Sequence, residues 1–210
     1  MGLIEELKQA ILTGDLRRAP ELTERALGDG MSPLAIMELA CTPAMLEVGD
    51  KFKKGEIYVP EMLVSAMAVK AVLKALEPAL QSAPALFAAS IVLGTVKGDL
   101  HDIGKNLVGF MLEGAGVKVI DLEVDVSPGT FVDAVRTHKP NFLGMSALLT
   151  TTMPYMQETI LLLKEAGLRE DVRVIVGGAP VTEEYARQIG ADLYAPDAAR
   201  AQEMLRALIS

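Results

Sequence analysis

Short apolar runs alternate with amphipathic segments from residue 87 onward, and this alternation constrains the fold more than any other feature of the chain. The apolar runs cover residues 87–93, 117–122, 141–147, 172–177 and 191–195. The segments between and after them have apolar residues at helical spacing and cover 103–115, 128–138, 153–167, 181–189 and 197–208. Strands that alternate with helices form a parallel sheet with helices on both faces. We therefore predict an α/β fold with a flavodoxin-like, doubly wound parallel sheet of five strands.

The first 80 residues follow a different period. Their apolar residues recur at helical spacing, and no extended alternation occurs. Four helices with short connections predict a small bundle. The expected helices are one ending near Gly14, one capped by Asp15 and running to about Leu27, one opened by Ser32-Pro33 and running to about Val48, and one opened by Pro60. We expect a four-helix bundle domain over 1–80, a linker over 81–86 and a Rossmann-like domain over 87–210.

Charge and composition exclude several classes of partner. The chain has 210 residues and a net charge of −8, whereas binding to nucleic acid requires concentrated Lys and Arg. The single cysteine, Cys41, excludes an internal disulfide bond and fits a reducing compartment. The first ten residues carry charges where a signal peptide would be apolar, and the uncharged stretch 78–96 is interrupted by Pro78 and Pro84. We expect a soluble, cytoplasmic protein with no nucleic-acid or membrane partner.

One histidine stands where the first apolar run gives way to a helical pattern. The motif is Asp99-x-His101-x-x-Gly104. The aspartate can accept the proton of one ring nitrogen, which fixes the tautomer and leaves the other nitrogen as a metal ligand. Gly104 removes a side chain where a flat ligand needs a close approach. One histidine is too few for a bare metal ion, but it suffices for a metal that a macrocycle already holds.

Plainer interpretations of these residues stay open at this point. A histidine at the start of a helix is often a surface or capping residue. Lys97-Gly98 and Gly104-Lys105 suggest a phosphate-binding loop, although the motif Gly-x-x-x-x-Gly-Lys-Ser/Thr is absent. His138, the other histidine, is interpreted as a solvated residue at a helix end.

Two further motifs follow at the ends of later apolar runs. Ser146-Ala-Leu148 is separated from Gly104 by 41 residues (105–145), and Gly177-Gly178 is separated from Leu148 by 28 residues (149–176). Parallel strands place their carboxyl ends at one edge of the sheet, where ligands bind. We therefore expect the three motifs to converge.

The order and spacing of these three motifs resemble the cobalamin-binding domain of methionine synthase and its relatives. Within that family, the likeness is greatest to the small corrinoid proteins of methyltransferase systems, and it covers residues from about 30 to 205. The resemblance implies cobalamin or a related corrinoid as cofactor, with His101 as the axial ligand of cobalt. It also implies a hydrogen-bonded chain through Asp99 to Thr152, although Thr152 could equally cap the helix that starts at Met153.

The resemblance extends to contacts with the cofactor in both domains. In the sheet domain the implied contacts are Gly98, Asp99, Leu100, His101, Asp102, Gly104, Ser146, Leu148, Thr150, Gly177, Gly178 and Ala198. In the bundle, which would act as a cap over the corrin, they are Glu38, Phe52 and Val59. Phe52 and Val59 would shield the cobalt–carbon bond, and the family has leucine at the position of Val59.

By this resemblance the chain is a methyl shuttle, a component of a methyltransferase system. It would accept a methyl group on cobalt(I) from a substrate-specific methyltransferase and pass it to a second methyltransferase that uses tetrahydrofolate or a thiol. A reductive activase is a further expected partner. Methanol, methylamines and aryl methyl ethers all feed related carriers. The alternatives are a corrinoid mutase domain, a cobalamin-dependent sensor or regulatory module, and a flavodoxin-like domain without a corrinoid, which would leave the motif spacing unexplained.

Overall fold

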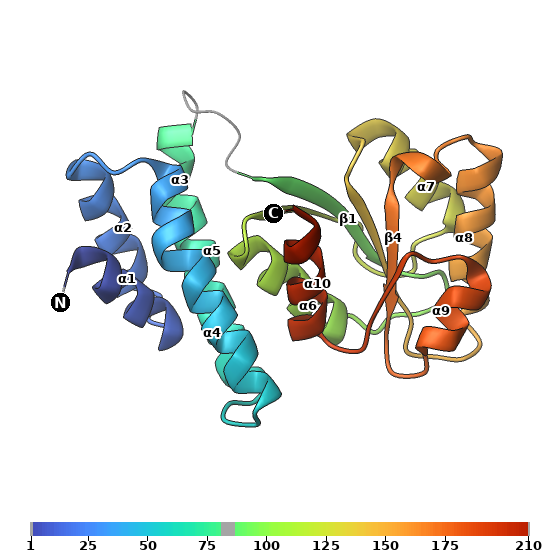
Figure 1. Ribbon diagram of the computed structural model, residues 1–210, viewed down its shortest axis with the longest axis horizontal. Coiled ribbons are helices and arrows are strands. Elements are labelled where there is room, and N and C mark those ends of the chain that lie inside the picture. The colour runs from blue at the N-terminus through green and yellow to red at the C-terminus, as the bar shows by residue number, and fades with distance from the viewer. Residues whose placement is uncertain (1, 81–86, 210) are drawn as a thin grey trace. The chain divides into compact units, whose positions relative to one another are not determined.

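The computed structural model describes residues 2–80 and 87–209, and these form two compact units (Figure 1). The first unit is built on the N-terminal helices and the second on a parallel sheet. The expected linker, 81–86, lies outside the described residues. Among the described residues, no helix combines the length and the apolar character needed to cross a membrane.

The N-terminal unit is helical, as predicted. Its elements are α1 (Leu3–Leu12), α2 (Arg18–Gly28), α3 (Pro33–Ile36), a π-helical turn (Met37–Cys41), α4 (Thr42–Lys53) and α5 (Val59–Leu80). Ser32 Oγ accepts a hydrogen bond from the Ala35 amide at 3.2 Å and so caps α3. The third helix continues past the expected end at Val48. It ends instead at the left-handed Gly55 (φ 70°), where the Gly55 amide donates to Phe52 O and the Glu56 amide to Lys51 O.

The run from α3 to α4 is continuous through the π-helical turn. Its buried residues recur in pairs every four positions: Ile36 and Met37, Ala40 and Cys41, Ala44 and Met45, Val48 and Gly49. A regular α-helix has 3.6 residues per turn, so a four-residue repeat drifts around it by about 40° per turn, or about 120° from Ile36 to Val48. The wider π turn takes up most of this drift, because it inserts about one extra residue, or roughly 100°. The buried face therefore stays in line along the whole run.

The second unit is a five-stranded parallel sheet with the order β2-β1-β3-β4-β5. Its strands are β1 (Ala89–Thr95), β2 (Val117–Asp121), β3 (Phe142–Ser146), β4 (Arg173–Gly177) and β5 (Leu193–Ala195). Its helices are α6 (Ile103–Gly114), α7 (Pro128–His138), α8 (Pro154–Glu165), α9 (Glu183–Ile189) and α10 (Ala198–Ile209). This is the predicted flavodoxin-like order, which reverses direction between β1 and β3.

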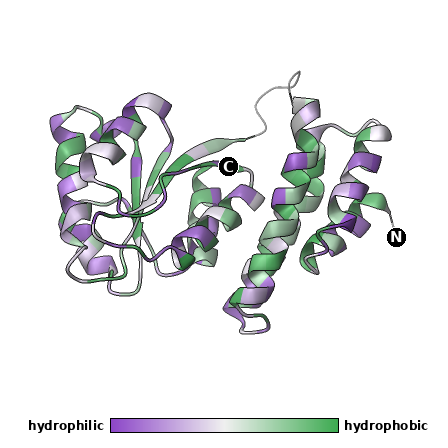
Figure 2. Cartoon of the chain, turned by 180° about the vertical axis from the view of Figure 1, so that it is seen from behind, coloured by the Kyte–Doolittle hydropathy of each residue, from purple (hydrophilic) through white to green (hydrophobic). Residues whose placement is uncertain are grey.

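Helices cover both faces of this sheet. α6 and α10 lie on one face and α7, α8 and α9 on the other (Figure 1). The core beneath α7 and α8 includes Val92, Phe131, Leu143, Ile160 and Val174, all fully buried. The helices of the unit carry hydrophobic and hydrophilic residues on different sides (Figure 2), which is the pattern that places one side against a sheet.

The first strand begins and ends two residues later than the expected run 87–93. Gly94 and Thr95, which the apolar pattern places in the following loop, belong to β1. A Cβ atom on Gly94 would lie 2.8 Å from the Phe131 ring. Glycine is therefore a strand residue here because it makes room for an aromatic ring of α7.

Four strands end at the same level of the sheet. Thr95 is paired with Ser146, Ser146 with Gly177, and Gly177 with Ala195. The loops after β1, β3 and β4 therefore leave the sheet side by side. The strand order reverses between β1 and β3, so the point of reversal, where ligands bind in folds of this kind, lies between the first two of these loops.

Candidate functional site

The His101 loop, residues 96–102, joins β1 to α6 at the carboxyl edge of the sheet. Its tight turn requires Gly98, whose φ of 77° lies in the left-handed region. Thr95 Oγ1 donates to the carbonyl oxygen of His101 at 2.9 Å, which holds the loop against the end of the strand. The side chain of His101 is 53% exposed, so its ring is available to a ligand.

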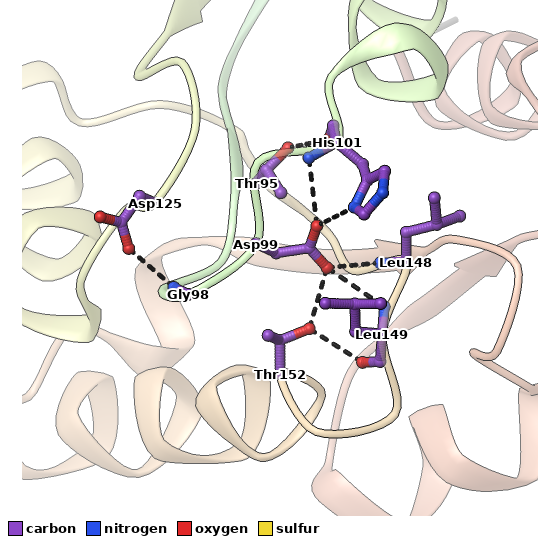
Figure 3. A network of polar contacts seen from close by, with 8 residues as sticks. All are labelled: Thr95, Gly98, Asp99, His101, Asp125, Leu148, Leu149 and Thr152. Atoms are coloured by element: carbon purple, nitrogen blue, oxygen red, sulfur yellow. Dashed lines mark hydrogen bonds and ion pairs between the residues drawn. The ribbon is translucent and has the colours of Figure 1, made fainter.

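Asp99 is fully buried at the centre of the site, and its carboxylate faces only hydrogen-bond donors (Figure 3). Oδ1 accepts from the His101 amide at 3.1 Å and lies 2.7 Å from His101 Nδ1. Oδ2 accepts from the amides of Leu148 and Leu149 at 2.7 and 3.2 Å, and from the Thr152 hydroxyl at 2.9 Å. A group surrounded in this way is satisfied only as an ionised carboxylate.

This arrangement sets both the charge of Asp99 and the tautomer of His101. Burial on its own would raise the pKa of the carboxyl. The hydrogen bonds that it accepts outweigh burial and hold the pKa of Asp99 well below its usual range. Because an ionised carboxylate only accepts, His101 Nδ1 carries the proton and Nε2, on the opposite side of the ring, keeps its lone pair. The site thus presents one partly exposed nitrogen ligand.

Acid should lower the free energy of unfolding of the protein by protonating Asp99. The folded-state pKa of Asp99 lies below its ordinary value near 3.8, so its contribution to stability is complete above that value and is lost as the pH falls toward the folded-state pKa. The difference in the free energy of unfolding between the wild type and Asp99→Asn should therefore narrow below a pH of about 4. Urea denaturation of the ligand-free proteins at a series of pH values measures this difference. A difference that stays constant down to a pH of about 3 would contradict the assignment.

Thr152 is tied to Asp99 rather than acting as a helix cap. Its buried hydroxyl oxygen lies 2.9 Å from Asp99 Oδ2 and 2.8 Å from the Leu149 carbonyl oxygen. The residue before α8 is Met153, and no side chain caps this helix. Of the two roles that the sequence left open, the structure supports the hydrogen bond to Asp99.

The two glycines at the end of β4, Gly177 and Gly178, are explained by packing within the protein. A Cβ atom on Gly177 would lie 2.6 Å from the Ala195 carbonyl oxygen. At Gly178 it would lie 1.9 Å from the Ala147 carbonyl oxygen, and the φ of 121° there is unfavourable for any other residue. The approach of β4 to its neighbours therefore explains both residues, and contact with a ligand at these positions stays a prediction.

Gly104 differs from these two. It lies in the first turn of α6 with an ordinary φ, and a Cβ atom on it would meet nothing within 4 Å. Nothing in the surrounding protein requires glycine at this position. The open space fits the expectation that a flat ligand approaches here.

Exposed apolar side chains surround the histidine. Leu100 and Ile103 are 71% and 75% exposed, and Leu148 and Leu149 are also exposed. Apolar residues grouped beside an exposed imidazole nitrogen suit a broad ligand with apolar faces. Among residues 2–80 and 87–209, no three His, Cys, Asp or Glu side chains are placed to hold a metal ion. The donor set therefore fits a metal that arrives in a macrocycle and takes one axial ligand.

The other expected contacts lie at or near the same edge. Ser146 ends β3, and its carbonyl oxygen accepts from the Val96 amide at 3.0 Å. Asp102 accepts from Asn106 Nδ2 at 3.0 Å, within the start of α6. Thr150 is exposed in the loop before α8, and Ala198 is buried at the start of α10. Asp102 is itself part of the His101 loop, and of the other three only Ser146 is bonded to that loop by a contact that the structure describes.

Three expected contacts belong to the helical unit. Glu38 is exposed in the π-helical turn, Phe52 is half-buried in α4, and Val59 is exposed at the start of α5. Their approach to the sheet site stays a prediction.

Sequence reasoning missed several residues that support the His101 loop. The Leu149 amide bonds Asp99, and Thr95 bonds the His101 carbonyl. Lys105, considered for a phosphate loop, is instead buried, with Nζ 2.6 Å from Asp121 Oδ1. Asp125 Oδ1 accepts from the Gly98 amide at 2.7 Å. Asp121 ends β2 and Asp125 follows it, but the sequence does not show that β2 lies beside β1, so neither contact could be predicted from it.

Comparison with known proteins finds matches to this chain in both sequence and structure. A family model described as a B12 binding domain matches residues 89–203, and a second model of the same description matches residues 3–77. Trimethylamine corrinoid protein 1 of Methanosarcina acetivorans is 39% identical over 99% of this chain and 97% of its own length. A corrinoid protein of Desulfitobacterium hafniense is 40% identical over 100% and 98%. A chain of the methanol:cobalamin methyltransferase complex of Methanosarcina barkeri matches with a TM-score of 0.89 and 29% identity, over 99% of this chain and 79% of that one.

Proposed function

We propose that this chain, which belongs to the family of B12-binding corrinoid proteins, is the methyl-carrying component of a methyltransferase system. The observation that carries the proposal is the exposed imidazole of His101, whose Nδ1 is fixed 2.7 Å from a buried, ionised aspartate. The matches to corrinoid proteins over the full chain favour a carrier over a mutase domain or a sensor.

A bound corrinoid supplies a cobalt centre that accepts and releases a methyl group. The residues of the chain hold and orient that centre. His101 would provide Nε2 as the axial ligand, while Asp99 keeps the proton on Nδ1 and Thr152 keeps Asp99 in place. Because the ring is tethered through Nδ1, it stays correctly oriented whether or not Nε2 is bonded. The exposed apolar residues Leu100 and Ile103 would lie against the macrocycle and exclude water.

The helical unit would cover the opposite face of the cofactor. Phe52 is half-buried and Val59 is exposed, so both retain apolar surface that a ligand can bury. Glu38 lies in a π-helical turn, a feature often found at functional sites. The role proposed for Phe52 and Val59 is to shield the transferred methyl group from water, whereas Glu38 is proposed only as a contact with the cofactor.

The proposed partners stand on either side of the transfer. A substrate-specific methyltransferase would deliver the methyl group, and a second methyltransferase would pass it to tetrahydrofolate or a thiol. The relatives at 39% identity are named for trimethylamine, whereas the methanol system matches at 29%. We therefore propose a methylamine as the first donor to test and methanol as the second. A reductive activase completes the proposed set.

Reconstitution with methylcobalamin tests this function. The wild-type protein should bind the cofactor and show the visible spectrum of a nitrogen-ligated form. His101→Ala should bind it with the spectrum of the form that lacks a nitrogen ligand. His138→Ala, which removes the other histidine of the chain, is the matched control and should behave as the wild type. Failure of the wild type to bind any corrinoid would refute the function, and an unchanged spectrum in His101→Ala would remove that residue from the site.

A further inference from the structure

The loop between β2 and α7 holds the His101 loop from the side opposite to Asp99's carboxylate. This loop, residues 121–127, is called the clamp loop here. Its Asp125 Oδ1 accepts from the Gly98 amide at 2.7 Å (Figure 3). The Asp125 amide donates to the Asp99 carbonyl oxygen at 3.1 Å. Glu123 O accepts from the Thr95 amide, and the Val126 amide donates to Thr95 O, at 3.0 and 2.9 Å. The two loops are therefore joined at both the base and the tip of the turn that carries the histidine.

The clamp loop has an unusual backbone. Glu123 and Asp125 have φ values of 68° and 56°, and both are residues with side chains in the left-handed region. Aspartate tolerates that region better than glutamate does, but glycine would adopt it most easily. A backbone of this kind persists where surrounding contacts hold it, and it is found most often at functional sites. At position 125 the side chain has a specific use, because its carboxylate accepts the Gly98 hydrogen bond.

The start of the clamp loop is fixed by an ion pair with α6. Lys105 Nζ lies 2.5 Å from Asp121 Oδ2 and 2.6 Å from Asn106 Oδ1. Asp121 Oδ1 also accepts from the Glu123 amide at 2.8 Å. The side chain of Lys105 is almost completely buried, whereas that of Asp121 is 41% exposed, so solvent reaches the pair only from the side of the carboxylate. The clamp loop is thus anchored to the helix that follows His101 as well as to the turn that precedes it.

We propose that Asp125 is a positioning residue for the axial ligand. Its carboxylate holds the Gly98 turn so that Asp99 and His101 present Nε2 in one orientation before the cofactor binds. The inference rests on the proposed corrinoid function and adds a residue that acts through the backbone of the ligand loop. Asp99 would then be held from two sides, its carboxylate by the loop after β3 and its backbone by the loop after β2.

Three variants separate the carboxylate from the backbone around it. Asp125→Gly removes the acceptor and adopts a positive φ without strain. Asp125→Asn keeps an oxygen that can accept from Gly98 and tolerates the same φ, but it has no charge. Glu123→Gly eases the same loop and removes a side chain for which the structure describes no hydrogen bond.

The first measurement uses the ligand-free protein and so does not depend on the proposed function. Amide hydrogen exchange and ¹⁵N relaxation report on Gly98 and His101. Asp125→Gly should raise the exchange rate of the Gly98 amide at least tenfold and increase the amplitude of motion of the His101 loop. Asp125→Asn should restore at least half of the lost protection of this amide. Glu123→Gly should show the exchange rate and the motion of the wild type. Unchanged protection of Gly98 in Asp125→Gly would overturn the inference.

The second measurement uses the methylcobalamin complex. Its visible spectrum is recorded over a temperature series that takes the nitrogen-ligated fraction through its midpoint. Loss of one charged hydrogen bond should lower the ligation constant roughly three- to tenfold in Asp125→Gly. Asp125→Asn should recover at least half of this effect on a logarithmic scale. Equal losses in Asp125→Gly and Glu123→Gly would assign the effect to the loop as a whole and overturn the role of the carboxylate. If the wild type binds no corrinoid, the proposed function fails, and if it binds one without nitrogen ligation, the role of Asp125 in positioning an axial ligand is overturned. The exchange measurement still decides in either case whether Asp125 holds the loop.

Discussion

Asp99→Asn should reverse the tautomer of His101 in the ligand-free protein. Both carboxylate oxygens of Asp99 face only donors, whereas an asparagine amide has one oxygen and one NH₂ group. An NH₂ group at the Oδ2 position would meet the Leu148 and Leu149 amides and the Thr152 hydroxyl. At the Oδ1 position it meets the His101 ring, which can adapt by moving its proton from Nδ1 to Nε2. The second orientation is therefore favoured, and it leaves no lone pair on the exposed nitrogen.

The same substitution should lower the stability of the fold. The His101 amide still points at the new NH₂ group, and the strongest acceptor of the site is gone, so we expect a loss of about 2 to 4 kcal/mol in the free energy of unfolding. Long-range ¹H–¹⁵N spectra of the imidazole identify the tautomer, and urea denaturation measures the stability. Thr152→Val is the matched control. It removes one donor, keeps the carboxylate and should leave Nδ1 protonated. An Asp99→Asn variant in which His101 Nδ1 still carries the proton would contradict the account of the site.

Gly178→Ala should destabilise the sheet unit by about 3 to 5 kcal/mol. The added Cβ would lie 1.9 Å from the Ala147 carbonyl oxygen, a distance that requires the backbone to move. The φ of 121° adds strain, because residues other than glycine rarely adopt it. β4 and the end of β3 would have to separate at the edge that carries the site. Thermal or urea unfolding of the ligand-free protein measures the loss.

Gly104→Ala is the contrasting substitution in the same motif series. Its Cβ meets nothing, and alanine favours a helix, so the ligand-free protein should be as stable as the wild type or more stable by up to about 1 kcal/mol. If the open space at Gly104 serves a ligand, the variant should bind cobalamin more weakly while folding normally. Unchanged binding of cobalamin by Gly104→Ala would remove that glycine from the ligand site. For Gly178→Ala, a free energy of unfolding equal to that of the wild type would show that the contact with the Ala147 carbonyl oxygen relaxes.

Periodicity predicts the fold because the buried faces of this chain repeat regularly. The apolar runs and the helical segments indicate the sheet class, and the expected strand at 141–147 differs from Phe142–Ser146 by one residue at each end. Two of the errors in the predicted bounds occur at glycines. The apolar pattern places Gly94 at the start of a loop, but it is a strand residue that makes room for Phe131. The third helix passes through the buried Gly49 and stops at Gly55, whose left-handed conformation no local pattern distinguishes.

The candidate site was predictable where a side chain carries the chemistry. Asp99 and His101 could be proposed from residue type and spacing, and Thr152 from the family resemblance; the structure brings the three within hydrogen-bonding distance. The contacts that support these side chains could not be predicted, because they involve backbone groups of loops that are distant in the sequence. The Leu149 amide has no signature in its side chain, and Asp125 reaches Gly98 across 27 residues of sequence. Such contacts depend on which loops the strand order makes neighbours.

The π-helical turn makes the helix from Pro33 to Lys53 sensitive to its length rather than to its composition. Its buried face is continuous only because one extra residue resets the phase between α3 and α4. Loss of a single residue from Met37–Cys41 would restore regular winding and rotate every later side chain of the helix, Phe52 included, by about 100°. Substitutions across this run can thus be absorbed one at a time, whereas an insertion or deletion cannot. In the evolution of such a domain, the number of residues in this helix would be conserved more strictly than the identity of most of them.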